Sequence, residues 1–346
     1  MVAGPILVLN AGSSSLKYAS YDRPSLSRLA QGQEALATST QSQSAALRAA
    51  LAKIAEVSGP PSAVGYRVVH GGALTEPAII TPEIRGQIEA AAPMAPLHNP
   101  PALKVIDAVQ SLYPNLPQIA CFDTAFHADN PPEATTFALP ERLRTKGLRR
   151  YGFHGLSYAS IVRRFKAETG QPLPNRLLAF HLGAGASIAA ILNGKGVATT
   201  MGFSPLDGLT MATRAGSLDP GLLLYLLQHE GMSASDIDHM LNHQSGLTAL
   251  AGSPDMKALL QSEAAEAQFA VSHFVYWAAR HAGSMIAAMQ GIDGIVFTGG
   301  IGENAAPIRS RILDRLRWAR LNPKRQVWVI PADEEDEIVQ MVKGFL

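Results

Sequence analysis

The chain contains two copies of a strand–glycine turn–strand pattern, and this repeat limits the possible folds more than any other feature. The central copy runs from Leu177 to Gly196, LLAFHLGAGASIAAILNGKG, and reads as two apolar strands joined by GAGA. The other copy, Ile6–Asp22, reads ILVLNAGSSSLKYASYD. At an offset of 171 residues in a chain of 346, Asn10 aligns with His181 and the glycine turns coincide. The repeat predicts two similar α/β domains that each offer a loop to a shared cleft.

The glycine turns are candidate phosphate loops. Glycine permits positive φ angles and close backbone approach, and unpaired N–H groups in such a turn can hold an anion. Ser13, Ser14 and Ser15 add hydroxyl groups to the first turn, and Lys17 adds a cation. The segment GSSSLK lacks the Gly-Lys-Ser/Thr ending of a Walker A loop. The alternative is two ordinary buried hairpins.

Composition excludes several classes of protein. Hydrophobic residues make up 47% of the chain and charged residues 16%, with a formal net charge of +1, so neither a nucleic-acid partner nor a membrane partner is expected. Cys121 is the sole cysteine, which fits a reducing compartment. The apolar opening GPILVLNAG is too short for a membrane span and lacks the features of a signal peptide. We therefore expect a cytoplasmic protein.

Two charged residues lie where strands are predicted. Arg67 is within the apolar run AVGYRVV, where a charge is costly unless it is paired, so it is either part of an ion pair or an anion ligand. Asp123 ends the strand of QIACFDTAFH, the position at which open α/β sheets bind ligands. Its alternative role is to cap the following turn.

Glycine-rich segments punctuate the second half of the chain. The segment LRRYGFHG, Leu148–Gly155, is the expected domain junction. Thr199–Gly221 is a long loop with Arg214 as its cation, and Ser245–Met256 is a second, turn-rich loop. Asp293–Asn304, DGIVFTGGIGEN, predicts a strand and a glycine loop, with a helix after Pro307. The tail predicts a strand, an acidic turn at DEEDE and a last helix.

Eight motifs occur in the order found in the acetate kinase family, which the chain resembles from residue 6 to about 340. They are LVLNAGSSSLKY, GYRVVHGG, APLHNP, FDTAFH, YGFHG, HLGAGAS, MGFSPLDGL with TRAG, and GGIGEN. The resemblance implies two actin-like, ribonuclease H-like domains with mixed sheets around a central nucleotide cleft. The N-terminal domain would comprise residues 1–147 and 331–346, and the C-terminal nucleotide-binding domain residues 148–330.

The resemblance also implies a reaction. Acetate kinases transfer the ATP γ-phosphoryl group reversibly to acetate, which gives acetyl phosphate and ADP in organic acid metabolism. Mg²⁺, with Mn²⁺ as an alternative, and a homodimer would be expected. A substrate one or two methylenes longer, propionate or butyrate, stays open, because such differences are worth only about 1–3 kcal/mol in an apolar pocket. A degenerate actin-like nucleotide-binding protein is the alternative from another class.

The family pattern assigns roles residue by residue. Arg67 would bind the substrate carboxylate, Asp123 would be the catalytic carboxylate, and His154 and Arg214 would act on the transition state. The acyl pocket would be lined by Val69, Leu97, Phe153 and Pro205. Nucleotide contacts would be Lys17, His181, Leu182, Gly183, Ala184, Gly185, Asp255, Met256, Lys257, Gly300, Ile301, Gly302, Glu303 and Asn304. The metal ligands would be Asn10 and Glu334.

The chemistry of the substrates suggests a specific role for Asp123. A short-chain carboxylic acid has a pKa of roughly 4 to 5, so at pH 7 it has no proton for a general base to remove. We therefore expect Asp123 to position Mg²⁺, directly or through water.

The sequence departs from the family pattern at a few places. Ala184 stands where the family usually has Asn, and Tyr66 where it usually has His. The chain is shorter than typical members between Lys17 and Arg67 and between Asn304 and Glu334. Asp333 and Glu335 flank Glu334 and are alternative acidic ligands.

Overall fold

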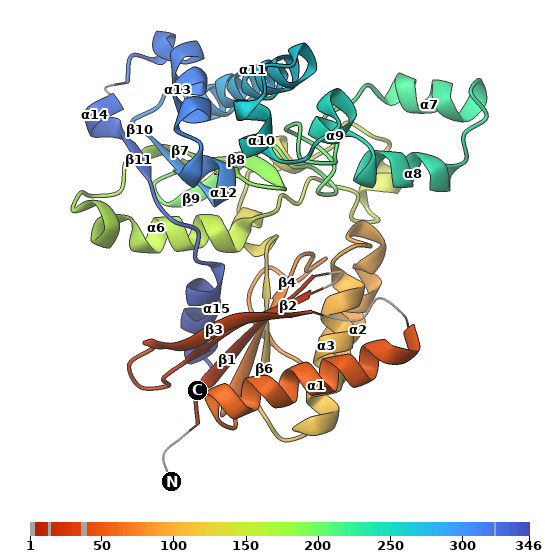
Figure 1. The fold of residues 1–346 in the computed structure, drawn as a ribbon, viewed down its shortest axis with the longest axis vertical. Helices are drawn as coiled ribbons and strands as arrows, with labels where there is room; N and C mark the ends of the chain where they lie inside the picture. Colours follow the sequence, from red (N-terminus) through yellow and green to blue (C-terminus); the bar gives the residue numbers. More distant parts are fainter. Residues whose placement is uncertain (1–3, 13–14, 36–39, 322) are drawn as a thin grey trace. The chain divides into compact units, whose positions relative to one another are not determined.

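The chain folds into two compact units that are discontinuous in sequence. The structure is a computed structural model that describes residues 4–12, 15–35, 40–321 and 323–346; Ser13 and Ser14 of the first turn lie outside them. The first unit combines residues 1–128, 153–160 and 333–346, and the second combines residues 129–152 and 161–332. Each unit is built on one mixed β-sheet (Figure 1).

The sheet of the first unit has the order β3-β2-β1-β4-β6-β5. Antiparallel pairs join β1 to β2 and β2 to β3, whereas β1, β4 and β6 are parallel neighbours. The strands are β1 Ile6–Ala11, β2 Ser15–Tyr21, β3 Arg28–Ala35, β4 Ala63–Val68, β5 Ala78–Ile79 and β6 Gln118–Phe122.

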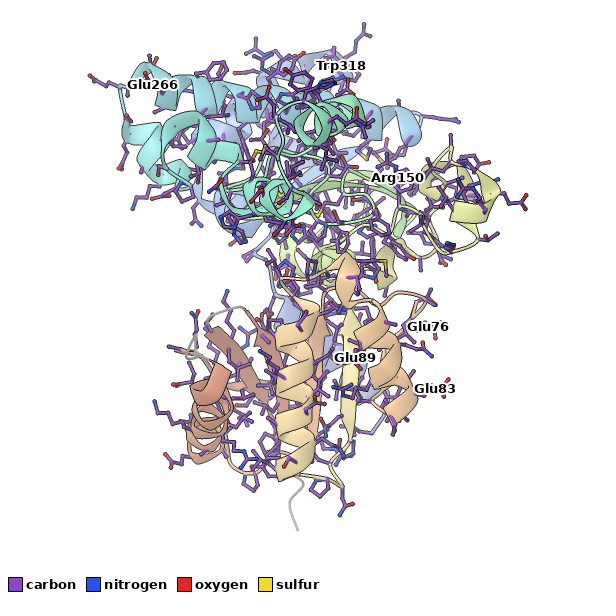
Figure 2. All side chains as sticks on the ribbon, turned by 90° about the vertical axis from the view of Figure 1, so that its right-hand side faces the viewer. Glu76, Glu83, Glu89, Arg150, Glu266 and Trp318 are labelled. Carbon is purple, nitrogen blue, oxygen red and sulfur yellow. The ribbon has the colours of Figure 1, made fainter. Side chains whose placement is uncertain are left out.

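Alternating apolar residues bury both faces of this sheet. Leu7 and Leu9 pack with helices α1 (Thr40–Ser58) and α3 (Asn99–Leu112), while Ile6 and Val8 pack with α15 (Glu334–Lys343) on the opposite face. Helix α2 (Pro82–Ala90), which carries Glu83 and Glu89 in Figure 2, packs beside α3.

The sheet of the second unit has the order β11-β10-β7-β8-β9. Its strands are β7 Arg176–Leu182, β8 Ala186–Leu192, β9 Lys195–Thr199, β10 Gly294–Thr298 and β11 Val327–Val329. Here too an antiparallel run of three strands is extended by parallel neighbours on the side of its first strand. The repeat predicted from the two hairpins is therefore confirmed in the topology of both sheets.

Helices connect and cover these strands. The longest is α11 (Ala265–Ala288), which packs on β8 and β9 and against α13. The remaining α-helices are α4 Pro132–Thr135, α5 Glu141–Arg144, α6 Gly155–Thr169, α7 Pro220–Gln228, α8 Ala234–His243, α9 Gly246–Ala251, α10 Met256–Gln261, α12 Gly299–Asn304, α13 Ala306–Arg315 and α14 Pro323–Gln326. Within the ranges given above, no helix is long and apolar enough to cross a membrane.

Three local predictions were wrong, and one strand was not predicted. The predicted glycine loop after β10 is helix α12, because the Glu303 carboxylate accepts the Gly299 N–H and satisfies the helix start. The predicted turn-rich segment 245–256 contains α9, and the predicted acidic turn is the first turn of α15, capped by Asp333. Strand β3 was not predicted, because as a half-exposed edge strand it shows no apolar alternation.

Candidate functional site

Three predicted site residues lie at one edge of the first sheet. Asn10 is near the end of β1, Arg67 near the end of β4, and Asp123 directly follows β6. These strands are parallel neighbours, so their carboxyl ends share an edge. Residues from three separate motifs are thus brought together by strand register.

Arg67 joins two carboxylates at this edge. Its Nη2 and Nε lie 2.7 and 3.1 Å from Asp123 Oδ2, and its Nη1 lies 3.3 Å from Glu334 Oε2 in the first turn of α15. The ion pair that was an open alternative for Arg67 is therefore present. A guanidinium has five N–H groups, so two remain without a partner in the described part of the chain. These two are available for a planar anion such as a carboxylate.

The cluster is buried and carries an excess of negative charge. The side chain of Asp123 is 1% exposed, that of Glu334 14% and that of Arg67 18%. Burial raises the pKa of Asp123; the charge of Arg67 opposes this and that of Glu334 adds to it, so the net pKa is above its ordinary value. Burial lowers the pKa of Arg67, but the two carboxylates outweigh it and hold the guanidinium charged.

The segment from Phe153 to Gly155 is tied to Asp123. The Gly155 N–H donates to the Asp123 carbonyl at 2.8 Å, and the Leu156 N–H hydrogen-bonds the Asp123 carboxylate. A Cβ on Gly155 would lie 2.1 Å from that carbonyl oxygen, so glycine is required there. His154 between them has a φ of 57°, in the left-handed region. The predicted residues Asp123 and His154 are thus structurally coupled.

The apolar residues of the predicted acyl pocket differ in burial. Phe153 is buried, and its ring meets His70 edge-on at 5.5 Å between centroids. Val69 and Leu97 are half-buried in the same unit, whereas Pro205 belongs to the second unit.

Sequence reasoning gave no role to several buried supports of this site. Asn99 Oδ1 accepts the His70 N–H at 3.1 Å, and its Nδ2 donates to the His70 carbonyl at 2.9 Å. His127 is fully buried, and its Nε2 lies 3.0 Å from the Phe153 carbonyl oxygen. All three residues stand inside the quoted motifs HGG, LHNP and FDTAFH, so the signal was present, but nothing in the sequence shows that they are buried.

Lys17 lies on β2 opposite Asn10 in the strand register. Its side chain is exposed and borders a polar groove that is also lined by Arg28, Gln31, Gln33 and Glu335.

In the second unit the structure brings two predicted nucleotide segments together. His181 and Leu182 end β7, which pairs in parallel with β10, and β10 leads directly into α12 with Gly300–Asn304. A Cβ on Gly299 would lie 2.8 Å from the Leu182 carbonyl oxygen. The turn Gly183–Gly185 and helix α12 therefore lie side by side at the carboxyl edge of this sheet.

The start of α12 is occupied by a side chain of the chain itself. Glu303 Oε1 accepts the N–H groups of Gly299 and Ala332, each at 2.9 Å, and Asn304 donates to the Gly300 carbonyl. A nucleotide phosphate at this helix end would meet the Glu303 carboxylate, so the Gly183–Gly185 turn is the more accessible anion loop.

The loop from Thr199 to Gly221 holds Arg214. Apart from its ends, where β9 stops at Thr199 and α7 begins at Pro220, it contains neither helix nor strand, and Arg214 Nη1 donates to the Pro205 carbonyl at 2.8 Å. The N–H groups of Leu247 and Thr248 at the start of α9 donate to the loop carbonyls of residues 211 and 212. The Ala212 N–H in turn donates to the Ala184 carbonyl at 3.2 Å, which links the loop to the glycine turn.

Arg214 is a buried cation without a counter-charge. Burial lowers its pKa to about 10, and no carboxylate lies within ion-pair distance of it in the described residues. A cation left unpaired in such a position is favourable where an anion is to be bound.

The third segment predicted to contact nucleotide, residues 255–257, lies at the start of α10. Asp255 caps α10 by accepting the Lys257 N–H at 2.9 Å, Met256 is buried, and α10 packs against α11.

The acidic residues of the first unit suit a magnesium ion. No group of three or more His, Cys, Asp and Glu side chains able to hold a metal occurs among the described residues. Mg²⁺ does not need one, because it commonly binds one or two carboxylates together with water and substrate phosphates. Asp123 and Glu334 share one guanidinium, which leaves net negative charge at the edge near Asn10. This donor set fits Mg²⁺.

Comparisons with known proteins agree with the arrangement. The model of the acetokinase family matches residues 5–341. The acetate kinase of Rhodopseudomonas palustris (strain ATCC BAA-98 / CGA009) is 47% identical over 303 residues, which cover 81% of this chain and 76% of the relative. That of Rickettsia typhi is 41% identical over 303 residues, covering 82% and 79%.

Solved structures give the same result. A propionate kinase from Francisella tularensis superposes with a TM-score of 0.88 at 33% identity, covering 98% of each chain. The Porphyromonas gingivalis acetate kinase superposes with a TM-score of 0.85 at 32% identity, again covering 98% of each chain. The predicted two-domain actin-like fold is thereby confirmed, and the chain belongs to the acetokinase family.

Proposed function

We propose that this protein is a short-chain carboxylate kinase that transfers the ATP γ-phosphoryl group to acetate and gives acetyl phosphate and ADP. The observation that carries the proposal is the cluster of Arg67, Asp123 and Glu334. A protein that binds only nucleotide has no need of a buried guanidinium that keeps two N–H groups available for a further anion. Curated relatives named acetate kinase support the choice of acetate.

Electrostatics explains why these residues suit the reaction. A carboxylate and a triphosphate repel one another, so in-line phosphoryl transfer depends on positioning and on cations around the equatorial oxygens. Arg67 binds the acceptor carboxylate, and its own position is fixed by Asp123 and Glu334. Arg214 and His154 act on the transferring group, and the Gly183–Gly185 turn holds nucleotide phosphate. Val69, Leu97, Phe153 and Pro205 contact the acyl tail.

Mg²⁺ bound by Asn10, Asp123 and Glu334 would neutralise phosphate charge. Asn10 and Glu334 are the ligands that the family pattern gives, and Asp123 adds a carboxylate whose raised pKa a nearby divalent cation would lower again. The metal role of Asp123 agrees with its inability to act as a useful general base on an already ionised acid.

The test is acyl phosphate formation by the purified protein with ATP and Mg²⁺, trapped with hydroxylamine, for acetate, propionate and butyrate in parallel. The highest kcat/KM is expected for acetate. Product with none of the acids, while ATP still binds, would refute the proposal in favour of a degenerate nucleotide-binding protein.

Propionate is the second candidate substrate, because the solved structure at 33% identity is a propionate kinase. The same assay decides between the two acids: a maximum of kcat/KM at propionate would identify this alternative.

We also propose that the protein forms a homodimer through α7. This helix reads PGLLLYLLQ and has no buried residue; Leu222, Leu224, Tyr225 and Leu227 are 44, 54, 51 and 42% exposed. A contiguous exposed apolar helix without charge marks an interaction surface. Because this apolar face carries no charge, two copies of it can pack on each other without repulsion, which favours a second copy of the chain as the partner.

Sedimentation equilibrium tests the dimer. Leu224→Glu should give monomers, whereas Val57→Glu on α1, where the valine is 64% exposed, should leave the dimer intact. A monomeric wild type would contradict the proposal. The buried Cys121, the sole cysteine, supports a cytoplasmic location.

A further inference from the structure

His127 is a buried histidine to which neither the sequence motifs nor the proposed reaction gives a role. It ends the short 3₁₀ helix Ala125–His127 that follows Asp123, and its side chain is fully inaccessible. The rings of Phe126 and Tyr158 meet it edge-on, with centroids at 5.5 and 5.7 Å. It therefore has a fixed orientation in the first unit.

One nitrogen of this ring holds the segment that carries His154. His127 Nε2 lies 3.0 Å from the Phe153 carbonyl oxygen. A carbonyl can only accept, so Nε2 carries the proton and donates. Nδ1 is then a lone pair, and it has no partner among the described residues. Burial lowers the pKa of His127 to about 4, although the bond to Phe153 opposes this, so the ring is neutral at physiological pH.

The residue after Phe153 needs such support. His154 has a φ of 57°, and a non-glycine residue in a sparsely populated backbone region costs of order 1–3 kcal/mol unless its surroundings fix it. Two hydrogen bonds flank it: His127 to the Phe153 carbonyl, and the Gly155 N–H to the Asp123 carbonyl. Both anchors come from the segment that follows β6.

We propose that His127 is a positioning residue that holds His154 in its left-handed conformation by donating a hydrogen bond to the Phe153 carbonyl. The inference rests on the proposed function for the importance of His154. Together with the bond from the Gly155 N–H to the Asp123 carbonyl, the hydrogen bond from His127 holds Phe153 and His154 beside the segment that begins with Asp123.

The test compares two substitutions that differ in one donor. His127→Phe keeps a buried ring but removes the N–H, whereas His127→Gln retains an amide donor in place of Nε2. Phe126→Leu is the matched control, since it removes packing from the same cluster and no hydrogen bond.

For His127→Phe we expect kcat to fall roughly 10- to 100-fold with little change in KM for ATP, because small misplacements near the reacting groups have effects of this size. His127→Gln should recover most of kcat. Phe126→Leu should lower the melting temperature and leave kcat nearly unchanged. An undiminished kcat in His127→Phe, an equal loss in His127→Gln, or an equal loss in Phe126→Leu would each overturn the proposal.

A second measurement does not depend on activity. Hydrogen exchange at the Gly155 amide should be faster in His127→Phe than in the wild type, by roughly tenfold, and slow again in His127→Gln. Equal exchange in all three proteins would refute the positioning role. An inactive wild type would refute the proposed function, while the exchange rates would still decide the role of His127.

Discussion

Replacing Arg67 by alanine should destabilise the protein strongly at pH 7 and less at pH 5. The guanidinium separates Asp123 from Glu334, which are 1% and 14% exposed. Removing one partner from a buried ion pair costs about 3–5 kcal/mol, because the remaining charge is left without compensation. We expect a loss of this size in the free energy of unfolding, measured by urea denaturation.

The sign of the pH effect follows from the pKa of Asp123. Arg67 is the largest influence that lowers this pKa, so its loss raises it further. A group whose folded-state pKa is raised contributes stability that is present at low pH and lost as the pH rises. Where the folded variant binds up to one proton more than the unfolded chain, the difference is worth at most about 1.4 kcal/mol per pH unit. Because its Asp123 pKa is raised further than that of the wild type, the variant should regain stability relative to the wild type between pH 7 and pH 5.

Arg85 provides a matched control on the surface. It also joins two carboxylates, with Nε 2.7 Å from Asp107 Oδ1 and Nη1 2.9 Å from Glu89 Oε2. These carboxylates are 49% and 62% exposed, and Figure 2 shows Glu89 on α2. Arg85→Ala should therefore cost only about 0–1 kcal/mol, with little pH dependence. An Arg67→Ala loss no larger than this, or one that does not shrink at pH 5, would refute the reasoning.

Three further predictions concern activity. Arg214→Met should lower kcat by roughly 10²–10³-fold and leave urea stability undiminished, since Arg214 is buried without a counter-charge; a loss of stability without a loss of kcat would contradict this. Asp123→Asn should weaken the apparent Mg²⁺ affinity in a kinetic titration, because it removes one carboxylate from the proposed metal site. An unchanged Mg²⁺ affinity with reduced kcat would exclude the metal role. Ala184→Asn should raise kcat by supplying a polar contact in the exposed glycine turn; steady-state kinetics that show no gain would exclude a missing contact there.

Local pattern predicted much of the fold. The apolar runs and glycine turns of both hairpins predicted the strands β1, β2, β7 and β8, and the 171-residue offset predicted two domains of similar build. Ser233 forms a capping box with Asp236 at the start of α8, which is a signal of a helix start within four residues of sequence. The hydrophobic pattern failed in two situations. An element was missed where a contact with a distant segment stabilises it, or where the strand is half-exposed, as β3 is. Helix α12, for example, also depends on Glu303 bonding Ala332.

The sequence by itself determined the family, the hairpin repeat and the residue types available for chemistry, because periodicity, turn residues and motif order are local properties of the chain. The tertiary structure decided how those residues are used. Arg67 and Asp123 are 56 positions apart and become an ion pair through strand register, and Glu334 reaches them from the last helix. Burial raises the pKa of Asp123, and the hydrogen bond from His127 fixes the backbone beside His154. Burial and partners depend on contacts between distant segments, and these form only when the chain has folded.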